Sequence, residues 1–398
     1  MLKILHIEDR FHPDRGYQIN FYAKYHSPGY ELYLLTSDSF SIWESGDTKK
    51  IIDVRDKEFE KENNIKIIRL PAALDRENRN NLWLKGLFKT IYDINPNIIY
   101  VHCIESLTSL RIILSGNILS KFRLYFDTHT LLNQFNRSLK FRLYLWLIRR
   151  FISWRLNKRE IKIFATYSEN AEILTRIYGI DPKNIFNSRI GTDPEIFHFD
   201  KISRENKRKQ FNIKEEDTVL LYTGKMNFQK NPHLILQALK LIEEDIHVPF
   251  HVLFVGPVHN TYIQEKFDEK FLNENIHIQL LPAKPVHELY QWYSMADFAV
   301  FPSENTLSSL DAQACHLPVI MEKDTTNCEQ LKEGGLVYEK GDLKDLAKNI
   351  LIFLKDAQLR KRMGEAGAKY IRQKYDYKII VRNIEADMGL IDMKYPSV

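Results

Sequence analysis

The sequence predicts an α/β protein built from two doubly wound, Rossmann-like domains in series. Short apolar runs alternate with helical stretches through the first half, and after a charged stretch at 198–217 the same alternation begins again. This alternation is typical of parallel sheets covered on both faces by helices. A chain of 398 residues, 44% of them hydrophobic, is long enough for two such cores and too apolar for a disordered protein.

The first domain is expected to span residues 1–190. A polar loop follows its first strand, and then Ile19, Tyr22 and Ala23 recur at helical spacing until Pro28-Gly29 ends the helix. The strands predicted in this half cover residues 4–7, 31–36, 65–70, 97–102, 124–129 and 162–166.

The second domain is expected to span residues 191–375, and a last helix within 376–398 is expected to cross back to the first domain. Asn231-Pro232 is a favourable helix start, a cap followed by proline in the first turn. In such domains ligands bind beyond the carboxyl ends of the strands, so functional residues are expected in the loops that follow strands. The predicted strands are 218–224, 250–256, 276–281, 298–302 and 318–322, and the predicted helices are 232–243, 287–296 and 308–315.

Composition narrows the class of protein. The net charge of +5 permits an anionic partner, but no dense basic stripe or known motif indicates nucleic-acid binding. The cysteines, which show no CxxC or zinc-like spacing, indicate a reducing compartment. No apolar run approaches the ~20 residues of a membrane span. The acidic pair Glu8-Asp9 interrupts any signal-peptide pattern, so a cytoplasmic location is expected. The cysteines are Cys103, Cys315 and Cys328.

The loop after the strand at 218–224 is the clearest candidate for an anion site. Lys225 and Lys230 flank it, directly after Gly224 and just before the helix that begins near Pro232. Cations and the amides of a helix start together bind anions well. Two solvated surface lysines are the alternative. Gly256 ends the neighbouring strand in the same way and would allow a ligand to approach the backbone closely.

A second loop with polar character follows the strand at 298–302. It carries Glu304, and a helix begins near Ser308 with Asp311 in its first turn. A carboxylate at this place can accept hydrogen bonds from the paired hydroxyls of a ribose. The amides of Thr306, Leu307 and Ser308 could face a phosphate. The alternative is that Asp311 only balances the helix dipole.

Taken in order, these motifs resemble the retaining glycosyltransferases of family 4. Those enzymes have the GT-B fold, in which two Rossmann-like domains face each other across a cleft. The stretch from Asp311 to Val319, Asp-Ala-Gln-Ala-Cys-His-Leu-Pro-Val, is similar to the family's Ala-x-Ala-Cys-Gly-x-Pro-Val motif. Gly191-Thr192-Asp193 matches the family's link between domains, and Gly16-Tyr17-Gln18 its glycine loop under the donor phosphates. The resemblance covers nearly the whole chain.

The resemblance assigns roles to individual residues. It implies that Lys225, in place of the family's arginine, and Lys230 bind the donor diphosphate and stabilise the leaving group. It also implies that Asp311 holds the ribose. The family's first glutamate, which contacts the donor sugar, aligns with Ser303, and Glu304 stands one place later, so either residue could take that role.

In the first half the resemblance points to a histidine. His129 ends the strand predicted at 124–129, where similar family members place a histidine near the donor sugar and the acceptor. A structural role is the alternative. His102 also closes a strand, but the apolar residues after it favour a structural role there.

The resemblance implies transfer of a sugar, with retention, from a nucleotide-sugar donor to a glycan, glycolipid or polysaccharide acceptor, in bacterial cell-surface glycan biosynthesis. It implies no metal and no other cofactor. A sugar-nucleotide epimerase and a non-catalytic GT-B binding or scaffold protein are the alternatives.

Residues 139–159 are rich in aromatic and basic side chains, which suits peripheral contact with anionic lipids on the inner face of the cytoplasmic membrane. A core helix is the alternative. On a wheel at 100° per residue, the basic residues of this stretch do not gather on one face.

Overall fold

The chain forms two compact units in the structure, a computed structural model. The first unit comprises Met1–Ile190 and Ile380–Val398, and the second comprises Gly191–Ile379. The division at 190/191 coincides with the predicted domain boundary, whereas the return to the first unit comes at Ile380 rather than at 376. The structure describes residues 1–40, 48–73, 82–130, 143, 146–267, 273–303 and 306–391.

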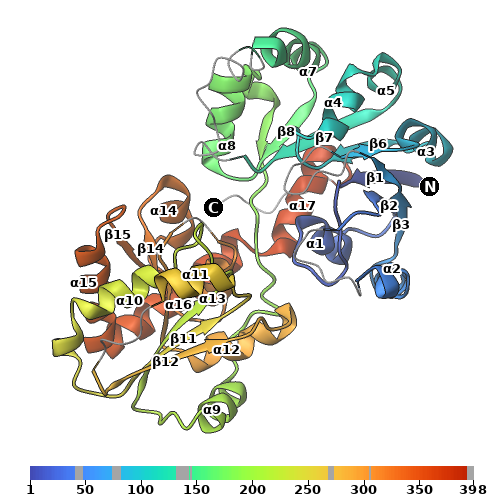
Figure 1. The fold of residues 1–398 in the computed structure, drawn as a ribbon. Coiled ribbons are helices and arrows are strands. Elements are labelled where there is room, and N and C mark those ends of the chain that lie inside the picture. Colours follow the sequence, from blue (N-terminus) through green and yellow to red (C-terminus); the bar gives the residue numbers. More distant parts are fainter. Residues whose placement is uncertain are drawn as a thin grey trace. The chain divides into compact units, whose positions relative to one another are not determined.

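The first unit is built on a seven-stranded sheet with the order β3-β2-β1-β6-β7-β8-β9, in which every pairing is parallel (Figure 1). The strand order reverses direction between β1 and β6. β6 is buried throughout, as expected of a strand covered on both faces. The strands are β1 (Leu2–Ile7), β2 (Tyr30–Ser37), β3 (Ile65–Leu70), β6 (Ile98–Val101), β7 (Arg123–Thr128), β8 (Lys162–Ala165) and β9 (Ile185–Asn187), and β4 (Ala72–Ala73) pairs antiparallel with β5 (Trp83–Leu84).

Helices pack on this sheet around a core that includes Ile99, Phe126 and Ile163. They are α1 (Gln18–Tyr25), α2 (Thr48–Asn63), α3 (Leu87–Ile94), α4 (Leu107–Leu114), α5 (Gly116–Lys121), the π-helix η2 (Ile148–Ser153), α7 (Trp154–Lys158), α8 (Ser168–Glu172), the π-helix η3 (Ile173–Tyr178) and the 3₁₀ turn η4 (Pro182–Asn184).

The last helix, α17 (Tyr377–Met388), packs on the first unit, although it is the most distant helix in sequence (Figure 1). Its Glu385 is fully buried and accepts hydrogen bonds from the Ser27 amide at 2.7 Å and from the hydroxyls of Ser27 and Tyr30. At its end, Arg123 donates to the Met388 carbonyl at 2.7 Å. These contacts attach the C-terminal helix to the first unit.

The second unit repeats the architecture with a six-stranded parallel sheet, in the order β12-β11-β10-β13-β14-β15. Its strand order reverses between β10 and β13. The strands are β10 (Thr218–Thr223), β11 (Phe250–Val255), β12 (Ile276–Leu281), β13 (Phe298–Phe301), β14 (Val319–Glu322) and β15 (Gly335–Tyr338). The helices are α9 (Lys201–Gln210), α10 (His233–Lys240), α11 (Asn260–Lys266), α12 (Leu289–Met295), α13 (Ser308–Ala314), α14 (Thr325–Leu331), α15 (Leu343–Lys355) and α16 (Ala357–Lys374), with 3₁₀ turns η5 (Glu243–Asp245) and η6 (Val286–Glu288).

Every strand predicted from the sequence is present, with ends that differ by at most two residues. Four short strands, β4, β5, β9 and β15, were not predicted, and 198–217 was expected only as a charged stretch. Half of that stretch is the helix α9. Its Arg208 is buried and donates to the Asp297 carboxylate at 2.7 Å, so an ion pair anchors a helix that has little apolar surface.

Within the described residues, no helix has both the length and the apolar character needed to cross a bilayer.

Candidate functional site

A pocket of about 260 Å³ opens at the carboxyl ends of β10 and β13, where the strand order of the second unit reverses. Open α/β sheets bind their ligands at this kind of place. Of the residues predicted to bind the donor, Gly224, Lys225, Lys230, Ser303 and Thr306 line the pocket. Its other lining residues are Tyr222, Thr223, Asn227, Gln229, Phe301 and Pro302.

The backbone at Gly224 starts the loop that carries the two lysines. Its φ of +147° lies where side chains are rarely tolerated, and its amide donates to the Val255 carbonyl at 3.0 Å. A Cβ at Gly256 would lie 1.9 Å from the Gly224 carbonyl oxygen. The close approach at Gly256 is therefore to the backbone of Gly224, and Gly256 is not among the residues that line the pocket. Gly256 packs against the start of the loop that carries Lys225 and Lys230.

Side-chain hydrogen bonds hold the same loop in shape. The Asn227 carboxamide oxygen accepts from the amides of Gln229 at 3.2 Å and Lys230 at 2.9 Å, and the Tyr222 hydroxyl donates to the Lys225 carbonyl at 2.8 Å. This loop sets both lysines on the pocket wall, so the pocket carries two positive charges in a small volume. Such a site attracts an anion.

The opposite wall comes from the loop after β13. Ser303 accepts a long hydrogen bond, 3.5 Å, from the Asn231 carboxamide. Leu307 and Ser308 do not line the pocket, and the Ser308 amide lies 3.4 Å from the Thr306 hydroxyl, which accepts from it. Of the three predicted amide donors, only Thr306 therefore reaches the pocket wall. Glu304 lies outside the described residues.

Asp311 lies in α13 and does not line this pocket. Its carboxylate accepts from the Thr192 hydroxyl at 2.6 Å, and burial raises the pKa of Asp311 to about 7. A buried hydrogen bond of 2.9 Å joins Thr223, on the pocket wall, to Tyr293, and the charge of Asp311 adds to the burial that raises the pKa of Tyr293. Asp311 is thus partly exposed and lies off the wall of this pocket, hydrogen-bonded to Thr192.

The first unit has its own polar cluster, at the carboxyl ends of the adjacent strands β1, β6 and β7. His102 Nδ1 lies 2.7 Å from the Asp127 carboxylate, and its Nε2 lies 3.0 Å from His6 Nδ1. His129 Nε2 lies 3.3 Å from the other oxygen of Asp127, which also accepts from the Cys103 amide at 2.7 Å. Within this cluster, the His129 side chain is 34% exposed, whereas His102 and Asp127 are buried.

Burial and charge have opposite effects in this cluster. Burial opposes ionisation of Asp127, but attraction to His102 and His129 outweighs it, so the pKa of Asp127 lies well below its usual range. Burial likewise opposes protonation of His129, but the Asp127 carboxylate raises the pKa of His129 above its ordinary value. Near the cluster, burial raises the pKa of Glu8 to about 7. The carboxyl ends of these strands therefore carry a histidine, His129, next to the ionised carboxylate of Asp127.

His129 was predicted from the sequence, whereas Asp127, which orients it, was not. The signal for Asp127 was its place two residues before His129, since alternate residues of a strand share a face. His102 has the buried, hydrogen-bonded position that the structural interpretation expects. Gly16 lies in the loop between β1 and α1, at the same edge of the sheet. In the described part of the chain, no group of three or more His, Cys, Asp and Glu side chains is arranged to hold a metal ion.

Residues 203–370 match the family model described as glycosyl transferases group 1. The chain is 27% identical over 206 residues to the capsular polysaccharide biosynthesis glycosyltransferase CapM of Staphylococcus aureus, covering 50% of this chain and 53% of that protein. It is 25% identical over 227 residues to the D-inositol 3-phosphate glycosyltransferase of Jonesia denitrificans, covering 54% and 53%. The matches span about half the length of these curated relatives.

Solved structures resemble the chain along its length. Sucrose-phosphate synthase from Thermosynechococcus elongatus aligns with a TM-score of 0.71 at 16% identity, over 98% of both chains. HepE of Anabaena, solved with UDP and glucose, aligns with a TM-score of 0.69 at 15% identity, over 98% of this chain and 100% of that one. The protein thus has the two-domain fold of the GT-B glycosyltransferases, and residues 203–370 of its second unit match the model of the glycosyl transferases group 1.

Proposed function

We propose that this protein is a retaining glycosyltransferase that moves a sugar from a nucleotide-sugar donor to a glycan or lipid-linked acceptor in cell-surface glycan synthesis. The observation that carries the proposal is that Lys225 and Lys230 line one pocket in the second unit, between β10 and β13, where the strand order reverses. The UDP in the HepE structure and the capsular polysaccharide named for CapM support this choice of donor and pathway.

In the proposed reaction the two lysines bind the donor diphosphate and stabilise the charge that develops as it leaves. The acceptor hydroxyl attacks the anomeric carbon on the face from which the diphosphate departs. A bond from that carbon to the acceptor oxygen forms, its bond to the phosphate oxygen breaks, and the leaving phosphate takes the acceptor's proton. Positioning then supplies much of the rate enhancement, and no protein nucleophile or divalent metal is required. His129, held by Asp127, is proposed to contact the sugar or the acceptor.

A thermal-shift panel of UDP, GDP, ADP, CMP and dTDP sugars tests the donor, because a specific ligand raises the unfolding temperature. Addition of acceptors should then release free nucleotide, with and without a chelator. A sugar-nucleotide epimer formed without an acceptor would indicate an epimerase instead. Stabilisation by a nucleotide sugar without any turnover would favour the scaffold alternative.

The pKa of Asp311 leads to a pH-dependent prediction for donor binding. If the ribose hydroxyls donate to this carboxylate, binding needs its ionised form, which grows as pH rises through about 7. A nucleotide sugar has no proton of its own to lose in this range. Its affinity should therefore be roughly tenfold higher at pH 8 than at pH 6, and Asp311→Asn should bind weakly at both pH values. Calorimetry measures both, with the exposed Glu244→Gln as the control. An Asp311→Asn protein that binds as tightly as the natural protein at pH 8 would exclude the ribose role.

The described part of the 139–159 stretch supports the membrane contact that the sequence suggested. Trp146, just before η2, Phe151 in η2 and Trp154 in α7 are each 50% or more exposed, and the rings of Trp146 and Phe151 lie 6.5 Å apart. Arg150 lies over the Phe151 ring at 5.8 Å and Lys158 over the Trp154 ring at 5.0 Å. Aromatic rings with cations beside them suit the surface of an anionic membrane. We propose that this face contacts the membrane peripherally. Residues 139–142 and 144–145 lie outside the described residues.

The triple variant Trp146→Ala, Phe151→Ala, Trp154→Ala is expected to lose most of its flotation with vesicles that contain phosphatidylglycerol. Three large rings leave the interface in that variant, and each contributes apolar contact area. The matched control is Ile51→Ala, Val54→Ala, which truncates two exposed apolar residues of α2. Equal flotation of the triple variant and this control would contradict the membrane contact.

A further inference from the structure

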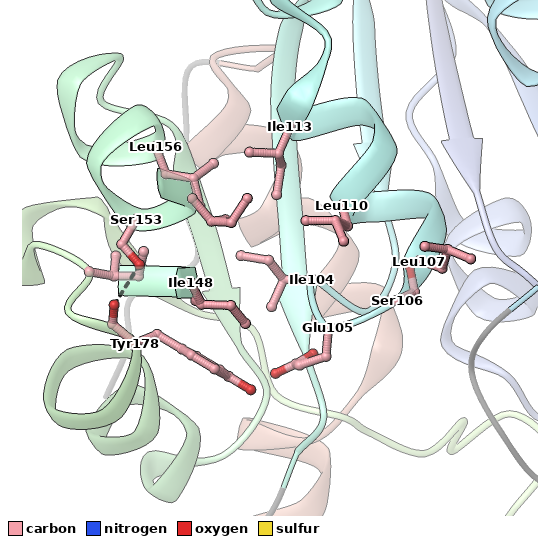
Figure 2. A pocket seen from close by; sticks show the side chains of 12 residues that line it. Ile104, Glu105, Ser106, Leu107, Leu110, Ile113, Ile148, Ser153, Leu156 and Tyr178 are labelled. Carbon is pink, nitrogen blue, oxygen red and sulfur yellow. Dashed lines mark hydrogen bonds between the residues drawn. The ribbon is translucent and has the colours of Figure 1, made fainter. Parts of the chain in front are cut away.

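The first unit contains an apolar pocket of about 130 Å³ between α4, η2, α7 and the end of η3 (Figure 2). Aliphatic side chains form most of its wall, among them Ile104, Leu110, Ile113, Ile148, Ile152 and Leu156. The hydroxyl of Ser153 is directed away from it, because it donates to the Tyr178 carbonyl. The pocket therefore presents hydrocarbon to anything that enters.

The pocket is closed at its base and accessible at its rim. Ile113, Ile152 and Leu156 are buried, whereas Ile104, Leu110 and Ile148 are partly exposed. An apolar cavity of about 150 Å³ in another protein stays dry and binds benzene. A pocket of this size and chemistry is suited to a short length of hydrocarbon rather than to water or a sugar.

One end of the pocket is polar. Glu105 and the hydroxyl end of Tyr178 lie there together (Figure 2). The Glu105 carboxylate accepts from the Thr128 hydroxyl, and Thr128 directly precedes His129. The polar end of the pocket is thus next to the carboxyl end of β7, where His129 and Asp127 lie. A ligand that fills the pocket would place its polar part at that end of the strand.

The helical segment that supplies Ile148, Ile152 and Leu156 to the pocket is the same segment that exposes Trp146 and Trp154 on its outer side. One short stretch of chain thus separates an internal apolar pocket from an exposed aromatic face with cations beside it. A hydrocarbon chain that leaves a membrane beside this face would find the pocket directly behind it.

We propose that this pocket binds the hydrocarbon chain of an amphiphilic acceptor, at the carbons next to its head group. The head group would then lie beside Glu105 and His129. The proposal rests on the proposed glycosyltransferase function and makes its acceptor a lipid with one isoprenoid or acyl chain.

Alkyl glucosides of increasing chain length, used below their micelle concentrations, test the pocket directly. Their affinity, measured by calorimetry, is expected to rise about threefold to fourfold with each carbon up to about six carbons, and then to level off as the pocket fills. Methyl glucoside should bind weakest. Affinity that does not depend on chain length would overturn the proposal.

Variants that fill the pocket provide the second arm of the test. Ile148→Phe replaces an aliphatic side chain at the rim by a larger aromatic ring, and a partly exposed position tolerates the added volume. Ile113→Phe fills the base of the pocket. Each should flatten the dependence on chain length, while Leu114→Phe, on the exposed neighbour of Ile113, should keep it. Thermal unfolding identifies any variant that fails to fold, and Ile148→Phe remains informative if Ile113→Phe unfolds. A folded Ile148→Phe protein with the full dependence on chain length would overturn the proposal.

Two further outcomes separate the pocket from the outer face and from the catalytic proposal. If the triple variant Trp146→Ala, Phe151→Ala, Trp154→Ala loses the chain-length dependence, the outer face binds the chain and the pocket proposal is wrong. If affinity depends on chain length but no donor gives transfer to any acceptor, the pocket proposal is kept and the proposed transferase function is rejected. Transfer that proceeds equally to methyl and hexyl glucosides would keep the function and reject the pocket.

Discussion

Replacing Lys225 or Lys230 by alanine is expected to lower the turnover of sugar transfer by about 10²-fold or more. Both side chains line the pocket at the ends of β10 and β13, and each is proposed to stabilise charge on the departing diphosphate. Loss of one such stabilising group typically costs about 3 kcal/mol in the transition state. The effect should appear mainly in kcat, because the charge on the leaving oxygen grows as the bond breaks.

The control for this prediction is Lys348→Ala, which removes an exposed lysine of α15 in the same unit. It should leave turnover and thermal stability unchanged. Lys225→Arg keeps the charge and restores the residue type that the resembling enzymes have, so it should retain most of the activity. Release of nucleotide from the donor, followed over time, measures the turnover of these four variants and of the natural protein. Unimpaired turnover in both alanine variants would remove the diphosphate assignment.

Arg208→Ala is expected to destabilise the second unit by about 3–5 kcal/mol. Arg208 is buried in α9, and its guanidinium donates to Asp297 at 2.7 Å and to the carbonyls of Met295 and Asp217, each at 3.1 Å. Its removal leaves a carboxylate and several carbonyls without their principal donor. Because Arg204 also pairs with Asp297 at 3.0 Å and can compensate in part, the loss should lie near the lower end of this range.

Urea unfolding of the full chain measures this effect, as a lower midpoint for the transition of the second unit. Because the chain has two units, the transition must be resolved for each unit before a free energy is assigned. Lys209→Ala removes the next residue's exposed charge and is expected to shift the midpoint little. Equal midpoints for the two variants would show that the buried ion pair does not anchor α9.

Much of the candidate donor site could be predicted because its parts are local. Lys225 and Lys230 directly follow one apolar strand, and Ser303 and Thr306 follow another, so the rule that ligands bind at strand ends selects both loops. Their meeting in one pocket depends on β10 pairing with β13, strands about 80 residues apart in the chain. The sequence predicted no such pairing, and only the resemblance assigned both loops to one donor. Asp311 shows the limit, since nothing near it in sequence indicates that Thr192 binds it.

The polar cluster of the first unit was harder to predict. His6, His102 and Asp127 come from three strands that are neighbours only because the sheet order is β1-β6-β7. Taken singly, each reads as an ordinary residue at the end of a strand. The hydrogen bonds that join them, and the opposing effects of burial and charge on the pKa of His129, exist only once the strands are paired.

By itself, the sequence determined the alternation of strands and helices, the two-domain organisation, and the loops that carry the lysines and His129. Those features follow from residues close together in the chain, whose periodicity and turn residues act locally. The tertiary structure decided the order of the strands, the burial of Arg208 in a helix that reads as polar, the π-helical turn at Ile148–Ser153, and the apolar pocket beneath it. Each of these depends on contacts between distant residues, which local periodicity does not encode.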